Sequence, residues 1–298
     1  MRGQHLVRFN QGKPVAMRPQ PKSTLVFMAG IVSLLSACAP APLMQGAGLS
    51  SYAGMTPSDG IVTKSRIHVQ KERVLAAKTI SIVPTAFPAT IAPKLTEQQR
   101  ALVANAVNRA LCVSLSDRFK VVTPDVLSDL TVRAVVTQAT ETDEIAAGVS
   151  AAVNIGTKFV DMGAPVPIPR VPIGLGNLSL EAEAIDAYGE QHAAMLWGRG
   201  ATAFFSSPKA SKASDAYDLA AAFGDDFGYL LVKGESPFKK ASLSIPSWQK
   251  INSAMGFAPK YAACESYGRA PGVVGVLGNQ IGLPPEWTDS GEKKIAQP

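Results

Sequence analysis

Alternation of apolar and polar residues is the clearest pattern in this chain, and a period of two is typical of β-strands. The alternation is longest over residues 130–140 and 178–186. Shorter β-branched runs cover residues 79–83 and 119–122, and a proline follows each within two residues. Because proline cannot donate a ladder hydrogen bond, we expect both runs to end there. The sequence therefore predicts four strands in these segments.

Residues 192–203 follow the turn Tyr188-Gly189-Glu190 and are predicted to return as the hairpin partner of residues 178–186. The alternation places leucines and alanines on one face of the first strand, and Glu181 and Glu183 on the other. Two carboxylates on one strand face, about 7 Å apart, could serve acid-base chemistry. We expect instead that they belong to a solvated outer face of a half-exposed sheet.

Helical spacing of apolar residues predicts two long helices. The first begins at a capping box, in which Thr96 and Gln99 satisfy each other's backbone amides, and runs to about Ser116. The second covers about residues 214–232, with a stripe formed by Leu219, Phe223, Phe227 and Leu230. The order of elements predicts an α+β fold, a mostly antiparallel sheet with two main helices packed on it.

The N-terminal pattern is different, because positive charges precede a short apolar run that ends in a cysteine. Arg18 and Lys22 come before residues 25–37, which are apolar or small. Leu35-Ser36-Ala37-Cys38 at the end of this run resembles a bacterial lipobox, so residues 1–37 are predicted to be a lipoprotein signal peptide. The alternatives are an uncleaved membrane span, for which 13 residues are too few, and a buried core helix.

This resemblance implies cleavage between Ala37 and Cys38 and acylation of Cys38, which would hold the protein to a membrane. Ala39 follows the cysteine, and the sorting rule of such signals then implies the outer membrane, with the domain in the periplasm. Either Met1 or Met17 could be the true start. No nucleic-acid partner is expected, because five basic residues and no acidic ones lie in the signal, leaving a net charge of +1 on 24 basic and 23 acidic residues.

Two cysteines, Cys112 and Cys264, are left once Cys38 is assigned to lipid. An even pair in an oxidising compartment predicts a disulfide, and two separate buried thiols are the alternative. No CxxC spacing suggests a metal site for either one.

The remaining segments complete the predicted organisation of the chain. Residues 38–60 are rich in Ala, Pro, Gly and Ser and are expected to be a flexible tether; residues 61–233 form the α+β domain. Residues 144–176 are expected to be an insertion that packs closely or is mobile, with a proline run that connects elements or docks a partner. The tail, residues 234–298, either folds back on the domain or binds a partner with Trp287 as an anchor.

Two motifs bring a family resemblance. The segment Gly48-Leu49-Ser50-Ser51-Tyr52-Ala53-Gly54-Met55 follows the lipobox closely, and the hairpin carries Glu181, Asp186, Gly189, Glu190, Ala193 and Ala194. Together they resemble the uncharacterised bacterial lipoproteins called domain of unknown function 3313, over about residues 48–233. Tyr188 departs from the family pattern, where Ser or Thr is usual. The resemblance implies an α+β fold and no assigned activity.

No catalytic constellation stands out in the mature chain. His68 and His192 lie far in the sequence from cysteines and from any convincing carboxylate cluster, and no nucleophile elbow, P-loop or HExxH is present. Asp225 and Asp226 are expected to be a pair on a helix surface. We therefore expect no enzyme, no cofactor and no metal.

Three functions are compatible with these features. The leading hypothesis is a lipid-anchored, non-catalytic module that binds another envelope component. A second is a subunit of an oligomeric export or pore assembly in the outer membrane, in which residues 144–176 lie between protomers. The third is a periplasmic hydrolase with a site assembled from distant residues.

Overall fold

The computed structural model describes residues 41–158, 170, 172–203, 206–239 and 246–291, which fall in one compact unit. The predicted α+β class is confirmed. A seven-stranded sheet has the order β1-β2-β7-β6-β5-β3-β4, and its pairs are antiparallel except for β3 with β4 and with β5. The strands are β1 (Thr56–Pro57), β2 (Thr63–Val69), β3 (Thr79–Ile82), β4 (Lys120–Val122), β5 (Leu130–Thr140), β6 (Asn177–Ile185) and β7 (Gln191–Gly200).

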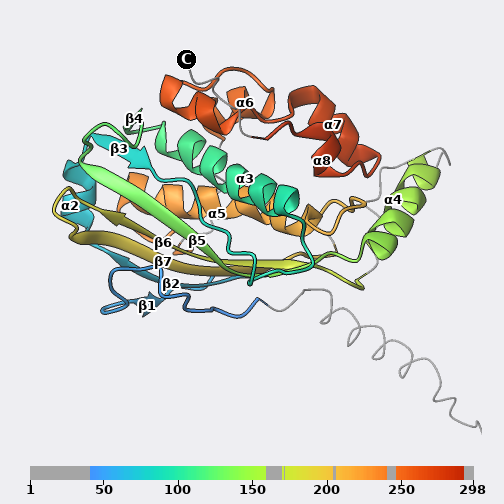
Figure 1. The fold of residues 1–298 in the computed structure, drawn as a ribbon, viewed down its shortest axis with the longest axis horizontal. Helices are drawn as coiled ribbons and strands as arrows, with labels where there is room; N and C mark the ends of the chain where they lie inside the picture. Colours follow the sequence, from blue (N-terminus) through green and yellow to red (C-terminus); the bar gives the residue numbers. More distant parts are fainter. Residues whose placement is uncertain (1–40, 159–169, 171, 204–205, 240–245, 292–298) are drawn as a thin grey trace, which may run out of the picture. The chain divides into compact units, whose positions relative to one another are not determined.

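Two long helices cover one face of this sheet, as the sequence predicts (Figure 1). They are α3 (Glu97–Leu115) and α5 (Ser214–Lys233). The capping box at Thr96 and Gln99 is present at the start of α3. The two helices approach closely at Gly224, where an added Cβ would lie 2.4 Å from the Ala110 Cβ, so α5 needs a glycine there.

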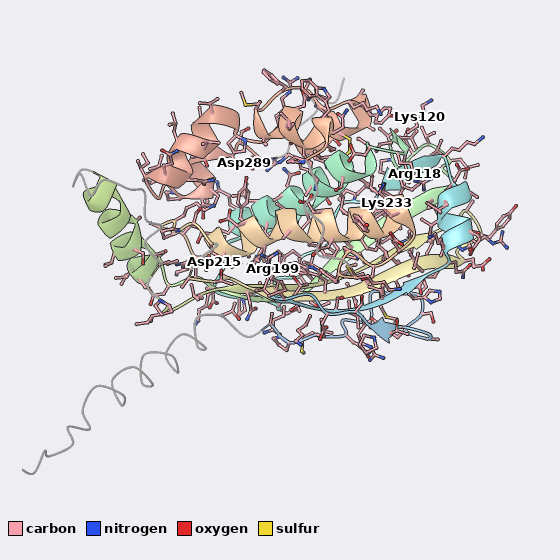
Figure 2. All side chains as sticks on the ribbon, turned by 180° about the vertical axis from the view of Figure 1, so that it is seen from behind. Arg118, Lys120, Arg199, Asp215, Lys233 and Asp289 are labelled. Carbon is pink, nitrogen blue, oxygen red and sulfur yellow. A yellow bond between two sulfur atoms is a disulfide. The ribbon has the colours of Figure 1, made fainter. Side chains whose placement is uncertain are left out.

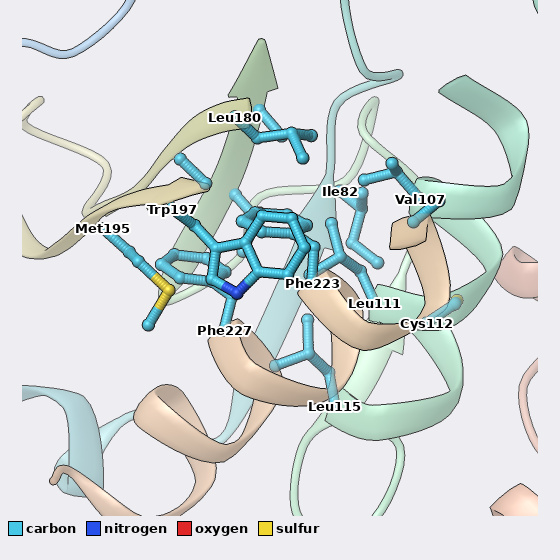
Figure 3. Close-up of a cluster of buried hydrophobic side chains, with 14 of the residues drawn as sticks. Ile82, Val107, Leu111, Cys112, Leu115, Leu180, Met195, Trp197, Phe223 and Phe227 are labelled. Carbon is cyan, nitrogen blue, oxygen red and sulfur yellow. The ribbon is translucent and has the colours of Figure 1, made fainter. Parts of the chain in front are cut away.

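The core lies between the sheet and these helices (Figure 3). Trp197 of β7 is fully buried and meets Phe223 of α5 edge-on, with ring centroids 5.7 Å apart. Phe223 in turn stacks on Phe227 at 5.9 Å. Such contacts add about 0.5–1.5 kcal/mol each to the stabilisation from buried area. The stripe predicted for α5 is therefore its core face.

The tail folds back over α3 and contains α6 (Trp248–Ala254), the 3₁₀ helix η1 (Ala262–Tyr267), α7 (Gly272–Gln280) and α8 (Pro285–Thr288). The predicted disulfide is present, since Cys264 of η1 is bonded to Cys112 of α3. Tyr267 donates its hydroxyl to the Ile82 carbonyl at 2.8 Å. Asp289 accepts from Arg109 of α3 and from the Tyr217 hydroxyl at 2.5 Å, and Figure 2 shows it between the tail and α3.

Other parts of the chain are more ordered than the sequence suggests. Residues 41–60, expected to belong to a flexible tether, lie within the compact unit, and Leu49 and Met55 are buried. The inserted segment begins with α4 (Glu144–Lys158), whereas most of its proline run lies outside the described residues. A short helix α2 (Lys71–Ala76) follows β2. Among the described helices, none has the length and apolar character needed to cross a bilayer.

The prediction that Asp225 and Asp226 form a pair on the surface of a helix is wrong for Asp226. Asp225 is exposed and pairs with Lys250 at 2.9 Å. Asp226 is half-buried and accepts the Trp197 indole N–H at 2.8 Å. Desolvation by burial raises the pKa of Asp226 from 3.8 to about 6, against the Trp197 hydrogen bond, which lowers it.

This burial predicts a pH-dependent effect of Asp226→Asn. Because folding raises the pKa, the folded protein binds more protons than the unfolded chain between pH 3.8 and about 6, so the carboxyl reduces stability as pH rises through that window. Asparagine keeps the acceptor for Trp197 without the charge. We expect urea unfolding at pH 7 to show a gain of about 1–2 kcal/mol that disappears near pH 4.

The matched control is Asp225→Asn on the same helix, for which we expect a change within about 0.5 kcal/mol at both pH values. A variant Asp226→Asn that is less stable than the wild type at pH 7 would contradict the assignment.

Candidate functional site

Glu181 and Glu183 of β6 lie on the sheet face opposite α3 and α5. The expectation that this face is solvated is wrong for them, because their exposed fractions are 0% and 1%. Residues 46–52 run across the strand and cover both carboxylates. We call Glu181, Glu183 and residues 46–52 the carboxylate clamp.

Among the described residues, the donors that hold Glu181 come from the N-terminal segment. Its Oε1 accepts the backbone N–H of Gly48, and its Oε2 accepts the N–H of Gly46 at 3.1 Å and the Tyr52 hydroxyl at 2.7 Å. Hydrogen bonds to a buried carboxylate stabilise a fold by about 1.5–3 kcal/mol each. The charge of Glu181 therefore has a network of local donors in place of water.

Glu183 has a second set of partners two residues along the strand. It accepts the Ser50 backbone N–H at 2.7 Å and the Ser50 hydroxyl at 3.0 Å. The Gln191 side chain donates at 2.8 Å, and Arg133, which is half exposed, lies 3.8 Å away. The period of two in β6 thus matches the spacing of the amides at 46, 48 and 50.

Glycine is needed where the segment approaches the strand. A Cβ on Gly48 would lie 2.6 Å from Glu181 Oε1, and a Cβ on Gly46 would lie 2.7 Å from Thr137 Cγ2. Both distances are too short for real contacts, so a larger residue at either position would have to displace these side chains.

Apolar contacts complete the clamp. Leu49 and Met55 are buried against Ala194 and Leu196 of β7, with Tyr52 packed beside them. Desolvation, and then the hydrogen bond to Glu181, raise the pKa of the Tyr52 hydroxyl, which stays a neutral donor at physiological pH. Since the carboxylate oxygens are engaged by the chain itself, the pair acts as a structural anchor for the N-terminal segment.

The clamp continues toward the predicted lipidation site. The Pro42 carbonyl accepts the Ser179 hydroxyl of β6 at 2.8 Å. The lipobox residues Leu35, Ser36, Ala37 and Cys38 lie outside the described residues.

The histidines differ from the sequence expectation. His68 of β2 is half-buried, whereas His192 of β7 is buried with its Nε2 3.1 Å from Asp186 Oδ2. The sequence showed no convincing carboxylate cluster for His192, whereas in the fold the β6–β7 turn brings Asp186 back to it. Asp186 also accepts the backbone N–H groups of Tyr188 and Glu190, both at 2.9 Å.

A second candidate site lies on the tail. Ten large apolar side chains on and beside α6, α7 and α8 are each 44% to 76% exposed. We call this set the tail surface: Trp248, Ile251, Met255, Phe257, Val273, Val274, Val276, Leu277, Ile281 and Trp287. Large apolar side chains exposed on neighbouring helices mark interaction sites more often than isolated exposed residues do.

A small cleft adjoins the tail surface where α3 meets the tail. Its lining includes Phe257, the Cys112–Cys264 disulfide, and the cations Arg109, Lys260 and Arg269, with no carboxylate among its lining residues. Lys260 donates to the Ser116 carbonyl at 2.9 Å. Arg109 is paired with Asp289, and Arg269 with Glu265 at 3.0 Å, which leaves Lys260 as a positive charge beside the apolar surface.

A signal for the clamp was present in the sequence. Small residues that leave their amides accessible recur at 46, 48 and 50, and glutamates recur with the same period at 181 and 183. Sequence periodicity alone does not state which segment lies over a strand, so the pairing emerges only in the fold.

Replacing Glu181 by Gln is predicted to destabilise the protein by about 2–3 kcal/mol, because the new NH₂ group faces backbone donors in a buried site. Urea unfolding at pH 7 measures this change. The matched control Glu72→Gln removes the same charge from an exposed position in α2, and we expect a change within about 0.5 kcal/mol. Equal stabilities of the two variants would refute the clamp.

Comparison with solved structures finds only partial likeness. PelC of Paraburkholderia phytofirmans, solved as a dodecamer, matches in two crystal forms at TM-scores of 0.32 and 0.33, with 10% and 9% identity, over 57% of this chain and 97% of PelC. Protein XCC0632 from Xanthomonas campestris, of family DUF330, matches at a TM-score of 0.30 with 13% identity, over 53% of this chain and 85% of its own. At these scores we draw no argument about function.

No curated protein matches the sequence. A family model described as "Protein of unknown function (DUF3313)" matches residues 46–227, a range that begins at the first glycine of the clamp and ends within α5. This confirms the family resemblance found in the sequence. The chain belongs to the DUF3313 family.

Proposed function

We propose that this protein is a lipid-anchored, non-catalytic module of the bacterial outer membrane that binds another envelope protein through the tail surface. The observation on which the proposal depends is the position of the exposed apolar tail surface. The tail helices α6, α7 and α8 that carry it lie beyond the α3–α5 layer, on the opposite side of the sheet from the clamped N-terminal segment (Figure 1).

The anchor is supported by the lipobox and by the short distance between Cys38 and the folded chain. Pro42 is already held to Ser179, and three residue steps from Cys38 to Ala41 span at most about 11 Å. An acylated Cys38 would therefore keep the outer face of the sheet near the bilayer.

The positions of the proposed anchor and of the tail surface indicate which kind of partner could bind the tail surface. The anchoring membrane would lie on the other side of the domain, so its lipids are a poor match for the tail surface. A second copy docked face to face would direct its own Cys38 away from the same membrane. We therefore infer a different protein, with an apolar contact surface and an acidic group that suits Lys260 beside the cleft.

The absence of catalysis is part of the same proposal. Glu181 and Glu183, the residues best placed in the sequence for acid-base chemistry, hold the N-terminal segment through hydrogen bonds at 2.7 to 3.1 Å and are buried beneath it. A substrate could reach them only if that segment were displaced.

The test places a photo-crosslinking residue at Val274 in living cells, with the same residue at exposed Lys64 as the matched control. We expect one protein adduct at position 274 and none at 64. The purified adduct partner should bind the purified chain with a Kd raised at least tenfold by the double substitution Val274→Asp and Leu277→Asp.

Intact-mass measurement of the membrane-extracted protein tests the anchor separately. A chain that starts at Cys38 with a diacylglyceryl and an acyl group, absent in Cys38→Ser, is the expected result, whereas an unprocessed mass would refute the anchor. An adduct to a second copy or to lipid, or no adduct, would refute the proposed partner whatever the mass shows.

A further inference from the structure

The turn between β6 and β7 brings three potential metal ligands together. Asp186, Glu190 and His192 each offer one ligand atom, and these atoms all lie within 4.8 Å of one another. Gly189 makes the close return possible, with a φ of 83° that other residues rarely adopt. We propose that this turn binds a divalent first-row transition metal of the zinc class, independently of the function proposed above.

A residue outside this group favours one tautomer of the His192 ring. Gln70, just after β2, donates its amide Nε2 to the Gln191 carbonyl at 3.2 Å, which fixes the orientation of the amide. Its Oε1 therefore faces His192 Nδ1, at 3.2 Å, and must accept a proton from it. In the neutral imidazole this leaves a lone pair on Nε2.

That lone pair faces a carboxylate oxygen. His192 Nε2 lies 3.1 Å from Asp186 Oδ2, while Asp186 Oδ1 is occupied by the backbone N–H groups of Tyr188 and Glu190. Two acceptors at this distance repel each other unless a proton or a cation lies between them. The His192 imidazole, which is 4% exposed, and the Asp186 carboxylate therefore face a common position that favours a proton or a metal cation.

The distances suit a metal ion. Ligands bonded at about 2.0–2.2 Å in neighbouring positions of a zinc site are separated by roughly 3.0–3.5 Å, and the 3.1 Å between Nε2 and Oδ2 falls in that range. Gln70 would hydrogen-bond the ring nitrogen of His192 that does not bind the metal and so orient the ring, as such partners do for other metal-bound histidines. Glu190 is exposed and can rotate to add a third ligand, leaving a position for water.

The donor set decides the class of metal. One imidazole and two carboxylates favour zinc and its neighbours over calcium or magnesium, which prefer sets made of oxygen alone. The competing occupant is a proton, which would make His192 and Asp186 a simple ion pair.

Isothermal titration of Zn²⁺ into the detergent-extracted, EDTA-treated protein tests the site. We expect one zinc per chain, a Kd at least tenfold weaker in Glu190→Gln, and no saturable binding in His192→Gln. His68→Gln is the matched control, since it removes the other mature-chain histidine, and it should bind as the wild type does. Because Glu190 is exposed, its replacement tests the site without a change in the core.

Co²⁺ in place of Zn²⁺ provides a spectroscopic readout, with a visible absorption band that is lost in His192→Gln. An absence of saturable zinc binding, the result expected for a protonated ion pair, would overturn the proposal. Binding that is unchanged in both Glu190→Gln and His192→Gln would overturn it as well.

Discussion

Two buried carboxylates determine how the N-terminal segment meets the fold. Glu181 and Glu183 lie under residues 46–52, and the amides at 46, 48 and 50 replace water as their donors. Burying a carboxylate without such partners costs several kcal/mol, so the segment and the strand depend on each other. The helices α3 and α5 therefore cover one face of the sheet, and the clamp covers the part of the other face around Glu181 and Glu183.

The clamped N-terminal segment and the tail lie on opposite sides of the sheet. The clamp holds the chain to the sheet from Pro42 onward, close to Cys38, while the tail is joined to α3 by a disulfide and by the Arg109–Asp289 ion pair. The clamp and the tail surface consequently belong to different layers of the domain. A lipoprotein built in this way would present its apolar tail surface away from the membrane that holds it.

The sequence predicted the strands and helices whose apolar residues all face the core between the sheet and the helices. Strand β5, hairpin β6–β7 and helices α3 and α5 were found in this way, and a chemical argument gave the disulfide partners Cys112 and Cys264. Prediction failed where a polar residue is buried by a distant segment. Alternation assigns Glu181 and Glu183 to solvent, and helical spacing does the same for Asp226, but partners far away in the chain cover all three. Neither the periodicity nor the composition of a segment shows which distant segment will bury its polar side chains.

The most direct test of this account is hydrogen exchange at the backbone amides of Gly46, Gly48 and Ser50 in the mature protein at neutral pH. Donation to buried carboxylates predicts protection close to that of the amides in β6, because release requires the clamp to open. Exchange at the rate of an unfolded chain, with β6 and β7 still protected, would show that the segment is a free tether and would contradict the account.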